Sequence, residues 1–177
     1  MDAIRKLREA FSGKTIVADM KIADTGSMEV EMAAKAGADI VVILGSADDS
    51  TVLEAVRAAK KYGARIMADL ISAPDPVSRS KELEGMDVDI INVHAGIDQQ
   101  MMGQDSLSIM KQVVKEVNIP VAIAGGLDAS SCAMAVKEGA AIVIVGGNIV
   151  RSADVRASAK VIRGAVDSLS VSEYSKV

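Results

Sequence analysis

Six short apolar runs, separated by segments with helical patterns, constrain the fold of this chain more than any other feature of its sequence. The runs are rich in Val and Ile and do not alternate between apolar and polar residues, which is typical of parallel strands buried on both faces. They cover residues 15–21, 39–45, 65–71, 89–95, 121–126 and 142–147. Strands that alternate regularly with helices predict an α/β fold with a parallel sheet.

Residues that start and stop helices occupy the gaps between these runs. Asp75 followed by Pro76 is typical of a helix start, and Asp128 begins a helical segment that Gly139 ends. Further glycines stand where helices are expected to stop, at positions 37, 63 and 85. We therefore expect a helix after each strand.

Two parallel architectures compete for this pattern. A doubly wound nucleotide-binding sheet favours a G-x-G-x-x-G turn after its first strand, and the sequence has none. A TIM (β/α)-barrel carries its chemistry at the carboxyl ends of several strands and often binds phosphate after its last two. Here charged residues end several apolar runs, and a glycine pair ends each of the last two, so the sequence favours the barrel.

A complete barrel has eight strands, whereas the sequence shows six. If the glycine pairs follow strands seven and eight, the run at 15–21 is the third strand, so we expect a barrel that lacks its first two strands. We expect this barrel domain to cover residues 1–168. Residues 169–177 are polar and serine-rich and are expected to form a flexible tail.

Composition and charge exclude several classes of function. The net charge is −4, the basic residues are scattered, and aromatic residues make up 2%, so a nucleic-acid surface has little support. No apolar run approaches the ~20 residues of a membrane helix. Cys132 is the only cysteine, so no intrachain disulfide can form, which fits a reducing cytoplasm. We expect a cytoplasmic protein with neither nucleic acid nor membrane as a partner.

Three charged residues lie in and after the first run, "VADMKIADTG". Asp19 and Lys21 are two residues apart on a strand, so their side chains share a face. At a barrel mouth, a carboxylate and an ammonium keep each other ionised and can stabilise charge on a bound substrate. Asp24 follows in the loop. The alternative is a structural ion pair followed by a helix cap.

Two further candidates end later strands. Asp69 ends the third run, where a second carboxylate could bind a metal or a sugar hydroxyl, or could simply cap the next turn. His94 ends the fourth run and is the only histidine. An ordinary imidazole pKa near ~6.5 suits proton transfer, although a lone histidine is more often structural.

The paired glycines Gly125–Gly126 and Gly146–Gly147 follow the last two apolar strands. Glycine lets backbone N–H groups approach an anion, so two such pairs predict a phosphate-binding site. The alternative for either pair is an ordinary turn.

Together these residues resemble the orotidine monophosphate decarboxylase superfamily, whose signature D-x-K-x-x-D ends the third barrel strand and here spans Asp19 to Asp24. Within it, the sequence resembles the 3-hexulose-6-phosphate synthases. The likeness extends from about residue 15 to about residue 165 and includes the stretches "EMAAKAGADIVVILG", "DPVSRSKELE", "VHAGIDQQMMG", "VAIAGGLDA" and "IVIVGGNI".

The resemblance implies a reversible aldol reaction that depends on Mg²⁺ (or Mn²⁺). Formaldehyde and D-ribulose 5-phosphate would join to give D-arabino-hex-3-ulose 6-phosphate, which would make the protein an aldehyde-lyase of the ribulose monophosphate pathway. The resemblance also implies a homodimer with shared active sites. It places two further strands before the first one found here, which would bring an acidic substrate ligand and a metal-binding glutamate.

The resemblance also assigns a role to each matching position. Asp19 would bind the metal and the substrate, Lys21 would stabilise an enediolate, and Asp24 would reach into the partner subunit's site. Asp69 would contact substrate hydroxyls or the metal shell, and His94 would transfer protons. The phosphate would lie against the glycines at 125, 126, 146 and 147.

Three other assignments compete with this one. A 3-keto-L-gulonate 6-phosphate decarboxylase uses the same enediolate chemistry, but relatives of that type carry an arginine where this chain has Ile97. Orotidylate decarboxylases carry a second lysine where this chain has Met20. The remaining alternative is a catalytically impaired barrel remnant that binds a sugar phosphate or a partner chain.

Overall fold

The structure, a computed structural model, describes residues 1–103 and 105–173, with side chains described as far as residue 168. It divides into two compact units, Met1–Asn92 and Val93–Val177, which we call the N-terminal unit and the C-terminal unit and describe separately. The prediction of one barrel domain over residues 1–168 stays a prediction.

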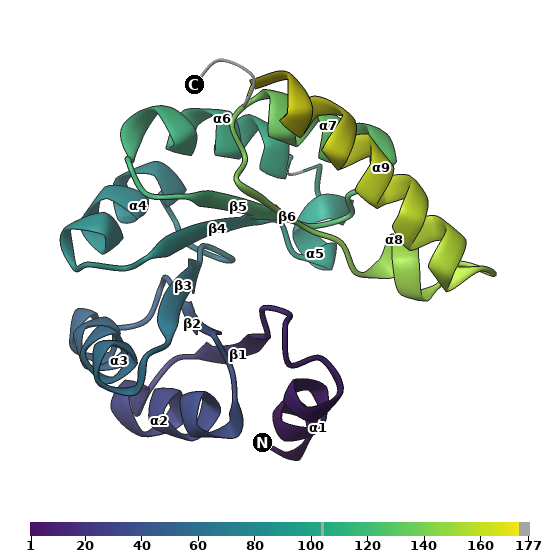
Figure 1. The fold of residues 1–177 in the computed structure, drawn as a ribbon. Helices are drawn as coiled ribbons and strands as arrows, with labels where there is room; N and C mark the ends of the chain where they lie inside the picture. Colours follow the sequence, from purple (N-terminus) through teal and green to yellow (C-terminus); the bar gives the residue numbers. More distant parts are fainter. Residues whose placement is uncertain (104, 174–177) are drawn as a thin grey trace. The chain divides into compact units, whose positions relative to one another are not determined.

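Parallel strands and their covering helices build the N-terminal unit (Figure 1). The strands pair in chain order and in parallel: β1 (Val17–Ile22), β2 (Ile40–Leu44), β3 (Arg65–Asp69) and the start of β4 (Ile90–His94), within which the unit ends. The helices are α1 (Asp2–Ala10), α2 (Gly26–Ala36), α3 (Asp49–Tyr62) and α4 (Pro76–Gly85). Helices α2 and α3 pack on each other and against β1–β3.

The core of this unit forms as the apolar runs predict. Val41, Ile43 and Ile66 are fully buried on their strands, and so are Val30 of α2 and Val52 of α3. Burial of several such side chains, at about 1.5–3 kcal/mol each, holds these helices on the sheet. The sheet thus presents the carboxyl ends of its strands, where the polar candidates lie, at one edge.

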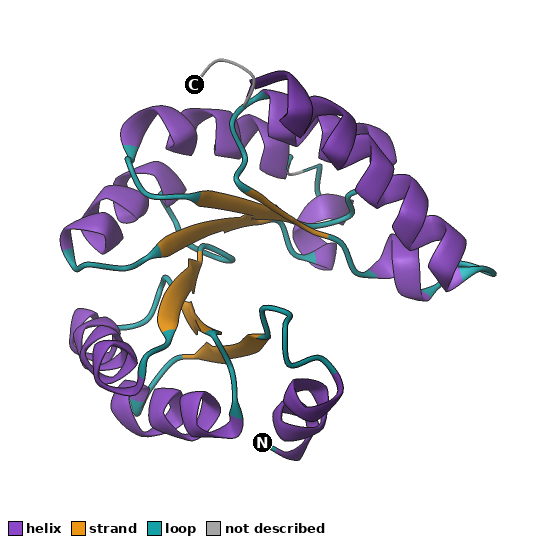
Figure 2. Cartoon of the chain, in the orientation of Figure 1, coloured by secondary structure: helices purple, strands orange, loops and turns teal. Residues whose placement is uncertain are grey.

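The C-terminal unit continues the alternation (Figure 2). Its elements are α5 (Ile97–Met101), α6 (Ser106–Glu116), β5 (Val121–Ala124), α7 (Ala129–Lys137), β6 (Ile142–Ile144), α8 (Gly147–Val150) and α9 (Val155–Glu173). Strands β5 and β6 pair in parallel, α6 packs on β5, and α9 lies along α7. Ile123 and Met110 are fully buried in this core.

Each of the six predicted runs contains a strand, but β6 is less buried than predicted. Ile144 is 37% exposed, whereas Ile123 of β5 is 0% exposed. Among the described residues, the C-terminal unit gives β6 one neighbouring strand, β5, so one edge of β6 and part of its faces remain uncovered.

The predicted helix boundaries are largely confirmed. Asp75 and Asp128 are N-caps whose carboxylates accept backbone N–H hydrogen bonds, and Gly37 and Gly63 end helices with positive φ. Helix α4 ends at Gly85, as predicted, and the left-handed residue that follows is Asp87, with φ +63°.

Helix α9 continues to Glu173, past residue 168, where the sequence predicts a flexible tail. Residues 169–173 are therefore helical, and residues 174–177 of that predicted tail lie outside the described residues. None of the helices in the described part of the chain is both long and apolar enough to cross a membrane.

Candidate active site

Lys21 lies at the centre of a charged cluster where β1 ends. Its Nζ lies 3.0 and 3.1 Å from the two carboxylate oxygens of Asp19 and 2.7 Å from Oδ2 of Asp69. The Asp19 side chain is 59% exposed, whereas Asp69 is 1% exposed. The structure therefore confirms that Asp19 and Lys21 share a face, and it adds Asp69 from two strands away. We call these three residues the Lys21 cluster.

The backbone at Lys21 is not that of a regular strand. Lys21 has φ +47°, and the pairing of β1 with β2 shifts register between Asp19 and Ile22. A bulge of this kind re-aims a side chain, and a left-handed residue other than glycine costs about 1–2 kcal/mol. Because the surrounding sheet must hold this conformation in place, the strain is concentrated at the residue with the candidate chemistry.

The charge on Lys21 is stabilised within the cluster. Burial acts to lower the pKa of Lys21, but hydrogen bonds and charges from Asp69 and Asp19 oppose it and outweigh it. The pKa of Lys21 is therefore raised above its ordinary value, and the side chain remains an ammonium at neutral pH. A fixed cation beside an open carboxylate can stabilise negative charge that develops on a bound molecule.

Asp69 is held from several sides. Its Oδ1 accepts a hydrogen bond from the Ile71 N–H at 2.9 Å, and its backbone carbonyl accepts one from the Gly45 N–H at 2.7 Å. Its partner on β4 is Asn92, which is 3% exposed. Sequence reasoning missed Asn92, although an amide inside the apolar run "DIINVHA" was a visible signal.

Asp24 lies in the loop after β1, as predicted. Its carboxylate accepts a hydrogen bond from the Thr25 N–H at 2.7 Å, next to the start of α2. It also borders a shallow cleft of about 360 Å³ that is lined by residues from the starts of α2 and α3. The local contact agrees with a turn-stabilising role and leaves the rest of the carboxylate facing solvent.

In the C-terminal unit, the two glycine loops lie close together. Gly125 and Gly126 have φ +108° and +67°, and a Cβ at Gly125 would lie 2.4 Å from the Ala95 carbonyl oxygen. The Asn148 amide nitrogen donates hydrogen bonds to the carbonyls of Leu127 and Gly126, at 2.8 and 3.2 Å. Asn148 therefore joins the loop after β5 to helix α8, which follows β6, a link that sequence reasoning did not find.

A positive charge and an amide also lie beside these loops. Arg151 follows α8, and a Cβ added at Gly147 would meet its guanidinium. Gln100 of α5 lies against Gly126 and donates to the Ala95 carbonyl at 2.6 Å. Gly146 stands at the start of α8, and His94 is the half-buried last residue of β4. Backbone N–H groups near an arginine suit a phosphate group.

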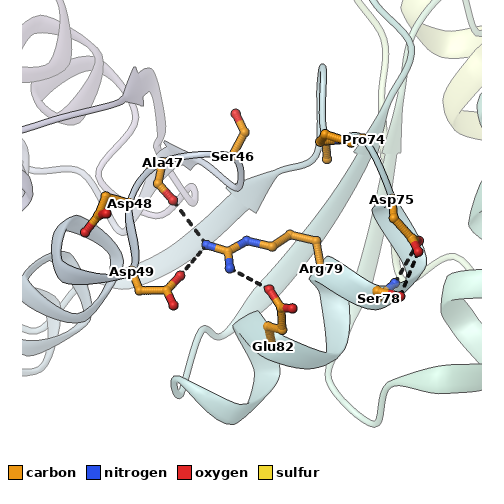
Figure 3. Close-up of a pocket in the computed structure, with 10 residues that line it drawn as sticks. Ser46, Ala47, Asp48, Asp49, Pro74, Asp75, Ser78, Arg79 and Glu82 are labelled. Carbon is orange, nitrogen blue, oxygen red and sulfur yellow. Dashed lines mark hydrogen bonds and ion pairs between the residues drawn. The ribbon is translucent and has the colours of Figure 1, made fainter.

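A second charged cluster lies in a cleft of about 490 Å³ beside α4 (Figure 3). Its centre is Arg79, which forms ion pairs with Asp49 at 2.8 Å and with Glu82 at 2.6 Å. Arg79 also donates hydrogen bonds to the carbonyls of Gly45 at 2.7 Å and Ala47 at 3.1 Å. These contacts occupy the guanidinium and tie the loop after β2 to α4, so we assign this cluster a structural role.

No three His, Cys, Asp or Glu side chains lie close enough together to hold a metal ion within the described residues. Asp19 nevertheless offers a carboxylate that is more than half exposed. Magnesium usually takes one or two carboxylates and fills its other positions with water and substrate oxygens. The residues present therefore fit an ion held by Asp19 together with a bound substrate.

Comparison with known proteins shows similarity to 3-hexulose-6-phosphate synthases. The chain is 41% identical over 155 residues to the 3-hexulose-6-phosphate synthase of Bacillus subtilis (strain 168), with 86% of this chain and 73% of that protein covered. It is 35% identical over 166 residues to the 3-hexulose-6-phosphate synthase of Mycobacterium gastri, with 94% and 80% covered.

Solved structures show the same likeness. The 3-hexulose-6-phosphate synthase from Salmonella typhimurium matches with a TM-score of 0.90 at 32% identity, over 94% of this chain and 80% of that one. A KGPDC from Streptococcus mutans in complex with D-R5P matches with a TM-score of 0.85, but at 21% identity it supports the fold alone.

These likenesses confirm the predicted TIM (β/α)-barrel fold class and the predicted resemblance to 3-hexulose-6-phosphate synthases. A family model described as "Orotidine 5'-phosphate decarboxylase / HUMPS family" matches residues 1–162. The chain therefore belongs to the orotidine 5'-phosphate decarboxylase / HUMPS family.

Proposed function

We propose that this chain acts as a 3-hexulose-6-phosphate synthase. The reaction is the reversible aldol condensation of formaldehyde with D-ribulose 5-phosphate to D-arabino-hex-3-ulose 6-phosphate, which makes the chain an aldehyde-lyase. The observation that supports this most strongly is the Lys21 cluster, in which an ammonium lies between an exposed carboxylate and a buried one. Such a group is suited to stabilising an enediolate.

The proposed chemistry begins with loss of a proton from the substrate carbon next to the carbonyl. The electron pair moves to the carbonyl oxygen, and the Lys21 ammonium stabilises the resulting negative charge. The enediolate carbon then bonds to the formaldehyde carbon, and the new alkoxide takes up a proton. His94 is our candidate for the proton transfers, because it ends β4 and an imidazole can both accept and donate a proton.

Magnesium (or manganese) is the proposed cofactor, with Asp19 as its protein ligand. When bound, it would supply Lewis-acid stabilisation of the oxygens of the enediolate. Asp69 would keep Lys21 in place and accept hydrogen bonds from substrate hydroxyls.

We place the substrate phosphate at the glycine loops of the C-terminal unit. The backbone at Gly126, Gly146 and Gly147 would bind it, with Gly125 providing the close turn and Arg151 adding positive charge. Binding the phosphate end positions the reacting carbons, which lowers the entropic part of the barrier.

We propose a homodimer with shared active sites, in which Asp24 reaches the partner's site. Met28 and Leu53, on the helices beside Asp24, are 58% and 45% exposed, and exposed apolar side chains of this kind suit a subunit interface. The predicted cytoplasmic location stays a prediction.

The decisive experiment mixes purified protein with ribulose 5-phosphate, formaldehyde and MgCl₂ and follows the loss of formaldehyde. We expect turnover that depends on all three components. A folded dimer that consumes no formaldehyde would contradict the proposal and favour an impaired barrel that only binds. Faster release of carbon dioxide from 3-keto-L-gulonate 6-phosphate would instead favour the decarboxylase.

A further inference from the structure

Asn92 carries a buried acceptor with no partner. Within the part of the chain that the structure describes, its Oδ1 is inaccessible to solvent and forms no hydrogen bond. Nine tenths or more of buried polar groups in native proteins are paired, because an unpaired one lowers stability. An exception of this kind next to a candidate active site suggests a function.

The position of Asn92 relates it directly to the Lys21 cluster. Asn92 is the register partner of Asp69 on the neighbouring parallel strand, and its backbone carbonyl accepts the Leu70 N–H at 2.9 Å. Register partners on parallel strands present their side chains to the same face of the sheet. The Asn92 amide therefore lies beside the carboxylate that contacts Lys21 at 2.7 Å.

An amide oxygen can only accept hydrogen bonds, so the missing partner must be a donor. The neighbouring Asp69 carboxylate supplies acceptors and cannot fill that need. A sugar phosphate offers several hydroxyl donors at the end of the molecule that reacts.

We propose that Asn92 Oδ1 accepts a hydrogen bond from a hydroxyl group of the sugar-phosphate substrate, which makes Asn92 a substrate-binding and specificity residue of the site. This inference rests on the proposed function only for the class of substrate. A buried acceptor discriminates strongly against analogues that lack the matching hydroxyl, because binding them leaves the acceptor unpaired.

The test replaces Asn92 with leucine, which has a similar shape and no polar atoms. We expect Asn92→Leu to bind ribulose 5-phosphate roughly 10-fold more weakly by calorimetry, with a similar fall in kcat/KM. We also expect the melting temperature without ligand to rise by about 2–4 °C, because the unpaired acceptor is gone.

The matched control is Ser80→Ala. Ser80 is also fully buried in the N-terminal unit, but its Oγ donates to the Val77 carbonyl at 2.7 Å. We expect this variant to melt at a lower temperature and to bind ribulose 5-phosphate as the wild type does.

Several results would overturn the proposal. Wild-type affinity in Asn92→Leu would do so, and so would a lower melting temperature with unchanged affinity, which would indicate a buried water as the partner. So would a wild type that does not bind ribulose 5-phosphate. The wild type could also bind ribulose 5-phosphate without turning it over, while Asn92→Leu binds it more weakly. This outcome would support the Asn92 assignment and contradict the proposed function.

Deoxy analogues of ribulose 5-phosphate, each lacking one hydroxyl, extend the test to the wild type, in case the leucine variant does not fold. We expect one analogue to bind the wild type more weakly than ribulose 5-phosphate does. The same analogue should bind Asn92→Ala no more weakly than ribulose 5-phosphate binds that variant. Equal losses in the two proteins for every analogue would contradict the proposal.

Discussion

The N-terminal unit contains two clusters in which one cation lies between two carboxylates, and they differ in how completely their groups are paired. Arg79 contacts Asp49, Glu82 and two backbone carbonyls, and its side chain is 16% exposed. Lys21 contacts Asp19 and Asp69, but Asp19 is 59% exposed and the neighbouring Asn92 keeps an unpaired acceptor.

The two clusters also differ in the backbone conformation of their central residues. Arg79 lies within the regular helix α4, whereas Lys21 has φ +47° at a bulge in β1. A cluster that serves stability pairs its groups and needs no strain. A cluster that binds a ligand leaves groups available and tolerates strain, because the ligand supplies the remaining contacts. The difference favours a structural role for Arg79 and agrees with the proposed chemical role of Lys21.

The largest expected effect is the loss of activity on Lys21→Met. We expect kcat to fall by roughly 10³-fold, because the loss of one fixed donor to an anionic transition state typically costs roughly 10²–10³-fold in kcat. Formaldehyde consumption measures it. The matched control is Lys60→Met, which removes a lysine paired with Asp87 on the surface and should leave kcat unchanged. Near wild-type turnover in Lys21→Met would remove the basis for assigning chemistry to this cluster.

The next effect concerns the third charge of the D-x-K-x-x-D signature. Asp24→Ala and Lys21→Met should each be nearly inactive alone. If Asp24 acts in the partner's site, a mixture of the two refolded together should recover roughly a quarter of wild-type activity, since half of the dimers then hold one intact site. A mixture as inactive as its two inactive components would show that Asp24 acts within its own subunit.

Arg79→Met should give the opposite result to Lys21→Met. We expect it to lower the free energy of unfolding by about 2 kcal/mol, because two carbonyls and two carboxylates lose their donor. Denaturant unfolding measures this, and kcat of the folded fraction should stay within roughly twofold of wild type. Arg57→Met, at an exposed ion pair with Glu54, is the control and should change neither. A large fall in kcat for Arg79→Met would show that both clusters contribute to activity, and it would contradict the proposed difference between them.

The sequence predicts the fold and part of the site because those features follow from periodicity. The apolar runs place the strands, and a spacing of two residues places Asp19 and Lys21 on one face. Strand ends at the same edge of a parallel sheet bring Asp69 to them. These inferences need only local geometry and the architecture.

The rest depends on packing between distant residues. The bulge that gives Lys21 a positive φ, the unpaired state of Asn92 and the links from Arg79 to Gly45 and Ala47 have no local pattern. The partial exposure of β6 likewise depends on which strands surround it. Contacts of this kind are fixed by three-dimensional packing, so a single sequence does not report them.

The smallest expected effect is a difference in how pH changes the contributions of Lys21 and Arg79 to the free energy of unfolding. The pKa of Lys21 is raised by Asp69 and Asp19 against the effect of burial, so its charge stabilises the folded state below the unfolded pKa of about 10.4. That contribution is lost as pH rises through the higher folded pKa. Above about pH 10, the unfolding free energy of the wild type should therefore fall relative to that of Lys21→Met, because the stabilising charge is lost. The difference between wild type and Arg79→Met should stay constant, because a guanidinium does not lose its proton in this range. Parallel behaviour of the two variants would mean that the charge on Lys21 contributes nothing to stability, and would leave catalysis as the reason for its strained position.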